Sequence, residues 1–229
     1  MASLLFEREG RYLSLRGEYI NRIGSRKEHV VTVEFIENRL LRDGKDKGHH
    51  VTVINHLEIN DRLPKTIVDD NGNEKPLSGK KKNKLFKEAQ QKLLHSIIDR
   101  FGNPSKWEKP VDLGLGSTKA EDAKAYYRVI FWPFGQRIRH SVGLGMTDFH
   151  ITVGFSPHDV HQYKGPGTLL CLEKKQPCTK ELYSRLIEYV PFYHQDKHFT
   201  GALFRTGWRH GYYTQLAHLS RILLQCEKD

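Results

Sequence analysis

The chain has 229 residues, of which 38% are hydrophobic and 28% are charged, which is typical of a globular protein and excludes a disordered or fibrous chain. The formal net charge of +10 favours contact with polyanions such as nucleic acid or phosphorylated ligands, although a solvated lysine face would give the same charge. No run approaches about 20 apolar residues, and charges at residues 7–9 interrupt the N-terminal segment, so we expect no membrane span, no targeting segment and a cytoplasmic or nuclear location.

The first half of the sequence alternates short strand-like runs with turns. Valine, threonine and aromatic residues, which favour strands, are frequent in three segments, at residues 11–15, 29–36 and 49–55. Turn-forming residues separate them at residues 24–27 and 42–48. We therefore predict a small antiparallel sheet in this part of the chain.

A lysine-rich segment and a helix follow this sheet. Residues 69–84 combine turn formers with lysines and lack a hydrophobic period, which predicts an exposed loop. The lysine cluster at residues 80–84 is typical of a solvated surface, and a nuclear-localisation or phosphate-binding role is the alternative. Apolar residues then recur on one stripe over residues 85–98, and Gly102 and Pro104 end the pattern, which predicts a core-facing helix.

In the second half, strand-like runs return and helices close the sequence. The predicted strands cover residues 111–115, 126–132 and 149–155, with breaks at residues 133–135 and 143–145. The predicted helices cover residues 180–190, ended by Pro191, and residues 212–226. This order predicts an α+β fold of two lobes, each a small antiparallel sheet flanked by helices, around a central cleft. We expect a single domain, with lobe one at about residues 1–105 and lobe two at about residues 106–229.

The motif His-x-Thr occurs three times, at His50, His150 and His198. Random order would produce about 0.6 copies, so a single copy carries no information. The first two copies differ from the third, because Val or Ile occupies both the intervening and the following position. About 0.007 copies of this longer pattern are expected by chance. Neighbouring residues in strands are correlated, which raises this expected number about tenfold, and the two observed copies still exceed it.

The spacing of this motif suits proton transfer at a phosphate. In a β-strand, residues two apart project from the same face, so His50 and Thr52 point together while Val51 enters the core. His150 and Thr152 follow the same rule. If both strands face one cleft, a phosphate between them meets two imidazoles and two hydroxyl donors. At neutral pH a neutral histidine accepts a proton and a protonated one donates it, so the pattern predicts metal-free acid–base catalysis.

The paired motifs resemble those of the two-histidine (2H) phosphoesterases, whose mark is a strand-borne HxT with hydrophobic flanks in each of two lobes. The segment GLGMTDFHITVG at residues 143–154, followed by SPHDVH at residues 156–161, is most similar to a LigT-like branch associated with RNA repair. The separation of 100 positions between His50 and His150 suits one motif per lobe. The resemblance implies that these histidines are the catalytic acid and base and that Thr52 and Thr152 bind the phosphate.

The resemblance also implies a substrate class. We expect a phosphoric diester hydrolase that opens a 2′,3′-cyclic phosphate at an RNA or nucleotide terminus, as in RNA processing and repair. Its partner would be an RNA 3′ end or a cyclic nucleotide, with no cofactor and no metal, and we expect a monomer. A phosphodiesterase for 2′–5′ or 3′–5′ oligonucleotides is one alternative, and a non-catalytic module that binds RNA ends is another.

Basic and aromatic residues around the second motif are further candidates for substrate binding. Arg137 and Arg139 precede this motif, and Tyr163 and Lys164 follow it. Arginine beside aromatic rings suits stacked bases and phosphates, and a strand core next to a solvated loop is the alternative interpretation.

Histidines outside the two motifs raise the possibility of a metal site. His158, His161 and His194 would be its ligands in a metal-dependent nuclease, but no carboxylates or thiolates at ligand spacing accompany them. The three cysteines show no CxxC spacing, so we expect reduced core residues.

Overall fold

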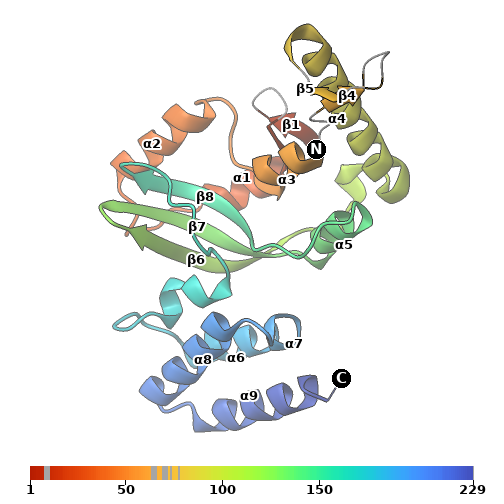
Figure 1. Cartoon of the computed structure of the whole chain (residues 1–229). Helices are drawn as coiled ribbons and strands as arrows, with labels where there is room; N and C mark the ends of the chain where they lie inside the picture. Colours follow the sequence, from red (N-terminus) through yellow and green to blue (C-terminus); the bar gives the residue numbers. More distant parts are fainter. Residues whose placement is uncertain (8–10, 63–65, 69–71, 73, 77, 229) are drawn as a thin grey trace. The chain divides into compact units, whose positions relative to one another are not determined.

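The computed structural model describes residues 1–7, 11–62, 66–68, 72, 74–76 and 78–228. It shows the predicted α+β fold, with two small antiparallel three-stranded sheets flanked by helices (Figure 1). The chain divides into two compact units, and each unit is assembled from separated segments. The first unit comprises Met1–Arg22, His49–Pro110 and Trp132–Thr147, and the second comprises Ile23–Gly48, Val111–Phe131 and Asp148–Asp229. A single boundary near residue 105 therefore does not separate the units.

The first sheet belongs to the first unit and has one apolar and one polar face. Its antiparallel strands follow the order β1 (Ser3–Glu7), β2 (Tyr12–Arg16) and β3 (Val51–Ile54). Leu15 pairs with Val51 on the buried face, and Ser14 pairs with Thr52 on the other. Successive residues of a strand point to opposite faces, so the aliphatic residues build the core and leave the polar ones together.

Helices and a short hairpin make up most of the rest of the first unit. Trp107 fixes the end of helix α4 (Gly79–Phe101), because its indole N–H donates to the carbonyl oxygen of Phe101 at 2.9 Å. The elements are α1 (Glu18–Gly24), α3 (His56–Arg62), the paired strands β4 (Thr66–Val68) and β5 (Glu74–Pro76), α4 (Gly79–Phe101), the 3-10 turn η1 (Pro104–Lys106) and α5 (Pro133–Ser141).

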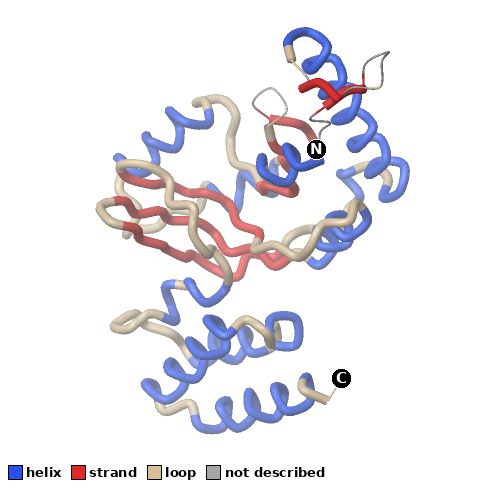
Figure 2. The backbone as a smooth tube through the Cα atoms, viewed as in Figure 1, coloured by secondary structure: helices blue, strands red, loops and turns tan. Residues whose placement is uncertain are grey.

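The second sheet consists of β6 (Val111–Ala120), β7 (Ala123–Phe131) and β8 (Phe149–Ser156), which lie side by side as antiparallel neighbours (Figure 2). Helix α2 (Val33–Asp43) packs on one face of it. Phe35 lies so close to Gly154 that a Cβ atom there would stand 2.7 Å from the Phe35 backbone, so only glycine allows this approach. Asn38 adds a side-chain hydrogen bond to the carbonyl oxygen of Phe155 at 3.1 Å.

The opposite face of the second sheet is covered by the C-terminal part of the chain. Tyr126 contacts Phe35 on the α2 side, so its neighbour Tyr127 points the other way, into a core shared with Phe199 and Leu203. This layer consists of η2 (Pro166–Thr168), η3 (Leu170–Leu172), α6 (Lys180–Ile187), α7 (Val190–Tyr193), α8 (Lys197–His210) and α9 (Tyr213–Cys226).

Three predicted elements were wrong. Residues 29–36, predicted as a strand, lead into α2, because Thr32 stands at the N-cap position and Glu34 in the first turn suits the helix dipole. The loop predicted at residues 69–84 was also wrong, because its lysine cluster lies on α4, which begins at Gly79. Strands β4 and β5 pair with each other before this helix. Residues 69–71, 73 and 77 of the predicted loop lie outside the described residues. Pro133, taken as a break, starts α5, since proline is favoured in the first turn of a helix.

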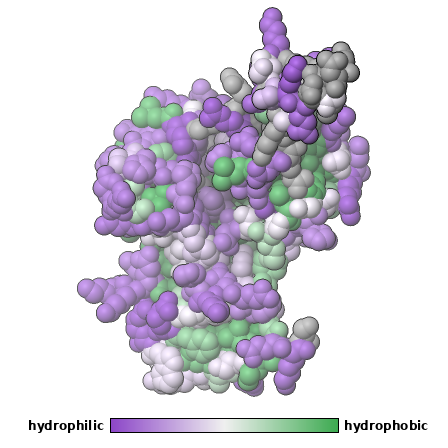
Figure 3. All heavy atoms as spheres, viewed as in Figure 1, coloured by the Kyte–Doolittle hydropathy of each residue, from purple (hydrophilic) through white to green (hydrophobic). Residues whose placement is uncertain are grey.

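Other differences are smaller. The predicted helix at residues 180–190 ends at Ile187, and Pro191 lies in the first turn of α7 instead of ending α6. The helix predicted at residues 85–98 is longer at both ends, as α4 covers Gly79–Phe101, and β6 continues to Ala120. The remaining predicted strands and the helix at residues 212–226 are confirmed within a few residues. Hydrophilic residues cover most of the face seen in Figure 3. Throughout the described part of the chain, no helix has both the length and the apolar composition needed to cross a membrane.

Candidate active site

The first HxT segment has the predicted alternation. Val51 and Val53 are fully buried at 0% exposure, whereas His50 and Thr52 are half-buried. Thr52 lies opposite Ser14 of β2, on the polar face of the first sheet. An imidazole and a hydroxyl therefore project from the same side of the sheet, and Val51 and Val53 pack into the core on the other side.

A buried carboxylate lies on this polar face. Glu7 is 4% exposed and accepts hydrogen bonds from the Ser14 hydroxyl at 2.7 Å and from the Arg16 guanidinium. Burial raises the pKa of the Glu7 carboxyl, but the hydrogen bonds from Arg16 and Ser14 and the charges of Arg16 and His50 hold that pKa below its usual value. Glu7 is therefore an ionised group inside the first unit.

The same cluster acts on His50. The charge of His50 is one of the causes that lower the pKa of the Glu7 carboxyl, so the two side chains lie close enough to interact. The ring of Tyr12, the strand partner of Glu7, lies with its centroid 5.5 Å from that of the imidazole. His49 is buried, and its backbone N–H donates to the side-chain oxygen of Asn21 at 2.7 Å, which fixes the chain just before His50.

The second HxT segment repeats the alternation in the second unit. Ile151 of β8 is fully buried and its neighbours His150 and Thr152 are half-buried. His150 pairs with Val129, and Thr152 pairs with Tyr127, so both point to the face that the C-terminal helices cover. The ring of Tyr127 meets the imidazole edge-on, with 5.7 Å between the centroids.

A backbone contact fixes the tautomer of His150. Its Nδ1 atom lies 3.3 Å from the carbonyl oxygen of Asp148. Because a carbonyl only accepts hydrogen bonds, Nδ1 carries the proton in this contact, and Nε2 is the other ring nitrogen of His150.

A buried ion-pair cluster adjoins His150. Lys164 Nζ donates to Asp159 at 2.9 Å, Arg42 also contacts Asp159, and both members of the first pair are under 10% exposed. Burial raises the pKa of Asp159, but the charges of Lys164, Arg42 and His150 hold it below its usual value. Burial also lowers the pKa of Lys164. Its ammonium lies 5.4 Å from the Tyr127 ring centroid, so Lys164 belongs to the surroundings of His150 as one half of an ion pair.

Two more acidic side chains stand near this site. The pKa of Asp148 is raised to about 6, first by burial and then by repulsion from Asp196. Asp196 caps α8 and accepts a hydrogen bond from the Tyr163 hydroxyl. That hydroxyl in turn accepts from the Gly167 backbone N–H at 3.0 Å, and burial raises the pKa of Tyr163. The Tyr163 ring also lies 5.0 Å from that of His198, so the third HxT copy has its histidine here, on a helix.

The two arginines before the second motif differ from one another. Arg139 is 3% exposed, and its guanidinium donates to Glu58 at 2.6 Å, to the Val53 carbonyl at 2.8 Å and to the Gly145 carbonyl at 2.9 Å. These bonds engage the guanidinium of Arg139, which was predicted to bind substrate, and tie α5 to β3 and α3. Arg137 is exposed and pairs with Glu108 at 2.5 Å.

The remaining histidine candidates are scattered. His158 and His161 are exposed, and His194 has its Nδ1 atom 3.0 Å from the carbonyl oxygen of Pro191. Within the described ranges, no group of three or more His, Cys, Asp or Glu side chains is placed to hold a metal ion.

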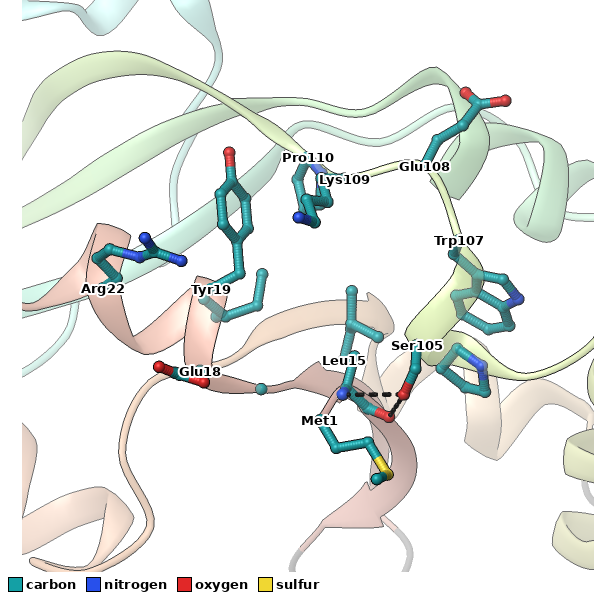
Figure 4. A pocket seen from close by; sticks show the side chains of 14 residues that line it. Met1, Leu15, Glu18, Tyr19, Arg22, Ser105, Trp107, Glu108, Lys109 and Pro110 are labelled. Carbon is teal, nitrogen blue, oxygen red and sulfur yellow. Dashed lines mark hydrogen bonds between the residues drawn. The ribbon is translucent and has the colours of Figure 1, made fainter.

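A cavity of about 230 Å³ lies elsewhere in the first unit (Figure 4). Tyr19 borders it, with Lys109 Nζ 5.4 Å and the Arg22 guanidinium carbon 5.7 Å from the ring centroid. Leu15 also lines it, and this residue belongs to the face opposite Ser14. The cavity is therefore separate from the polar face that carries His50.

The charged partners of the histidines were missed from the sequence. Glu7 and Arg16 lie on strands β1 and β2, and the sequence pattern of these strands does not predict that they pack near His50. Asp159 and Asp196 lie in loops, where no periodic pattern predicts their neighbours. A signal existed only for Asp159, within the SPHDVH segment.

A family comparison agrees with the two HxT strands. The matching family is described as Swiss Army Knife, 2H phosphoesterase domain (2H-SAK), and the match covers residues 11–161. This chain belongs to that family. Searches of curated proteins and of solved structures found no match. Both motifs lie inside the matched residues, and membership supports phosphodiesterase-type activity. Helices α6 to α9 lie beyond them, as do Tyr163 and Lys164.

Proposed function

We propose that this 2H phosphoesterase hydrolyses a 2′,3′-cyclic phosphate at an RNA or nucleotide terminus, without a metal, through His50 and His150. The observation that carries the proposal is the repeated strand geometry, in which each histidine shares a half-buried face with a threonine two residues later. The formal charge of +10 suits a polyanionic substrate.

His150 is proposed as the general base. Its Nδ1 proton is held towards the Asp148 carbonyl, so a neutral His150 accepts a proton from water at Nε2. The water oxygen forms a bond to phosphorus, and the bond from phosphorus to one ribose oxygen breaks. A protonated His50, whose charge interacts with the Glu7 carboxylate, gives its proton to that departing oxygen. Thr52 and Thr152 donate hydrogen bonds to the non-bridging oxygens, where negative charge grows in the transition state.

Alanine substitutions test this mechanism. His50→Ala and His150→Ala should each lower kcat on 2′,3′-cyclic nucleotides and cyclic-ended RNA by about 10²–10⁴-fold, because each removes one proton transfer. The double variant should lose much less than the product of the two losses, since both groups serve one step. Exposed His56 and His158 supply matched controls, whose alanine variants should keep wild-type rates.

The same assay separates the alternatives. Turnover should survive EDTA, and phosphorus NMR of the product assigns which ribose oxygen was released. Preference for 2′–5′ or 3′–5′ oligonucleotides over cyclic phosphates would identify the alternative phosphodiesterase. Tight binding of RNA 3′ ends with no product formed would identify a binding module. Wild-type turnover in either histidine variant would refute the proposed catalysis.

A further inference from the structure

The turn between α8 and α9 carries an exposed pair of aromatic rings. Trp208 is 65% exposed and Tyr213 is 61% exposed, with 5.5 Å between the ring centroids and 71° between the planes. The other tryptophans, Trp107 and Trp132, are only 7% and 2% exposed. Large aromatic side chains gain stability from burial, so two neighbouring rings held in solvent need another explanation.

Packing of the two helices does not require these rings. The buried side of α8 includes Phe199, Leu203 and Gly207, and that of α9 includes Leu216 and Leu219. Gly207 lets these two helices approach closely, since a Cβ atom there would lie 2.7 Å from the Leu216 side chain of α9. The core beneath the turn is thus complete, and the two rings lie outside it.

The segment that carries the rings has basic but no acidic residues. Residues 197–226 contain no Asp or Glu, although they include a lysine, three arginines and three histidines. Arg205 is exposed, precedes Trp208 by three residues on the same side of α8 and has no ion-pair partner among the described residues. Arg209 is exposed and donates to the carbonyl oxygen of Glu173 at 2.6 Å.

We propose that Arg205, Trp208, Arg209 and Tyr213, here named the aromatic–arginine patch, bind single-stranded RNA. Bases stack on exposed aromatic rings in a sequence-tolerant way, and arginines attract the phosphates between them. A protein partner would gain from the rings but would not explain a stretch of 30 residues without a carboxylate. The patch lies beyond residues 11–161, so it adds a binding surface to the part that the family shares.

The distribution of tryptophans provides a direct experiment. Because Trp208 is the exposed tryptophan, stacked RNA should quench its emission and protect it from acrylamide. Octauridylate with a 3′-hydroxyl is titrated into the full chain, and anisotropy of a fluorescein-labelled copy measures binding independently. Such an RNA offers no cyclic phosphate, so the result does not depend on the proposed hydrolysis.

Variants identify the contribution of each group. Trp208→Ala should weaken binding about 5- to 100-fold, as expected for the loss of one stacked base, and Trp208→Phe should restore most of it. Arg205→Ala should weaken binding and reduce its salt dependence. Arg221→Ala is the matched control, because Arg221 is exposed on α9 two turns beyond Tyr213, and it should change affinity less than 2-fold.

Three results would overturn the proposal. The first is unchanged Trp208 emission at RNA concentrations that saturate the anisotropy, which would place the RNA elsewhere. The second is an equal loss of affinity in Arg205→Ala and Arg221→Ala, which would show diffuse attraction. The third is an emission change that follows protein concentration without RNA, which would identify the patch as a contact between copies of the chain.

Discussion

Replacing Asp148 with asparagine should stabilise this protein at neutral pH and leave its stability unchanged in acid. Asp148 precedes the second HxT strand, and burial followed by repulsion from Asp196 raises its pKa from 3.8 to about 6. At pH 7.5 the folded protein must hold this carboxylate ionised where its charge is disfavoured. Asparagine keeps the shape and the backbone carbonyl that contacts His150 while it removes the charge.

The size and sign of the effect follow from the two pKa values. A rise from 3.8 to about 6 corresponds to about 3 kcal/mol between the folded and unfolded states, and partial exposure of the side chain reduces this to about 1–2 kcal/mol. Since the folded-state pKa is raised, the protonated group adds stability that is fully present below pH 3.8 and is lost as the pH rises through about 6. The variant lacks this loss.

Urea unfolding between pH 3.5 and 8 measures the difference. The free energy of unfolding of Asp148→Asn should equal that of the wild type at the acid end and exceed it by about 1–2 kcal/mol above pH 7. Asp122→Asn, in the exposed turn after β6, is the matched control and should stay within about 0.5 kcal/mol. A difference that is constant across this pH range would refute the reasoning.

Three further substitutions test the buried charge contacts. Arg139→Met should lower the free energy of unfolding by about 3–5 kcal/mol in urea, because it breaks a buried pair, whereas Arg137→Ala on the same helix should change it by about 0.5 kcal/mol or less. Glu7→Gln should destabilise by about 2–3 kcal/mol at pH 7 in the same assay, a difference that shrinks as the pH falls through the lowered pKa of Glu7. Lys164→Met should destabilise by about 3 kcal/mol in the same assay, and equal stability would show that the ion pair contributes nothing net.

Much of the sheet structure could be predicted, because strand alternation is a local property. The valines and isoleucines beside each HxT motif identify a strand with one buried face, and the structure has both strands where the sequence placed them. Residues 29–36 show the limit of this argument. Their Val, Thr and Phe residues favour a strand locally. In the folded chain, packing of Phe35 against Gly154 stabilises a helix, and the local pattern does not reveal this contact.

The candidate site divides in the same way. His50 and Thr52 share a face because of their spacing, so the sequence was sufficient for them. Glu7 and Arg16 join them through pairing of β1, β2 and β3, and that register is a property of the folded sheet. For Arg139 the sequence shows an arginine before a motif and does not show its carbonyl and carboxylate partners, because those contacts form between elements of the folded chain.

The two motifs have different charged neighbours. Among the described residues, Lys164 and Arg42 contact Asp159, the carboxylate that interacts with His150, and Arg16 contacts Glu7, the carboxylate that interacts with His50. Each imidazole is thus attracted to a buried carboxylate, and these two charges act on both rings in the same direction. His150, with Nδ1–H held by a carbonyl, presents Nε2 as an acceptor. Nearly identical HxT segments thus acquire different neighbours, because the folded chain brings Glu7 to one motif from β1 and Asp159 to the other from a loop.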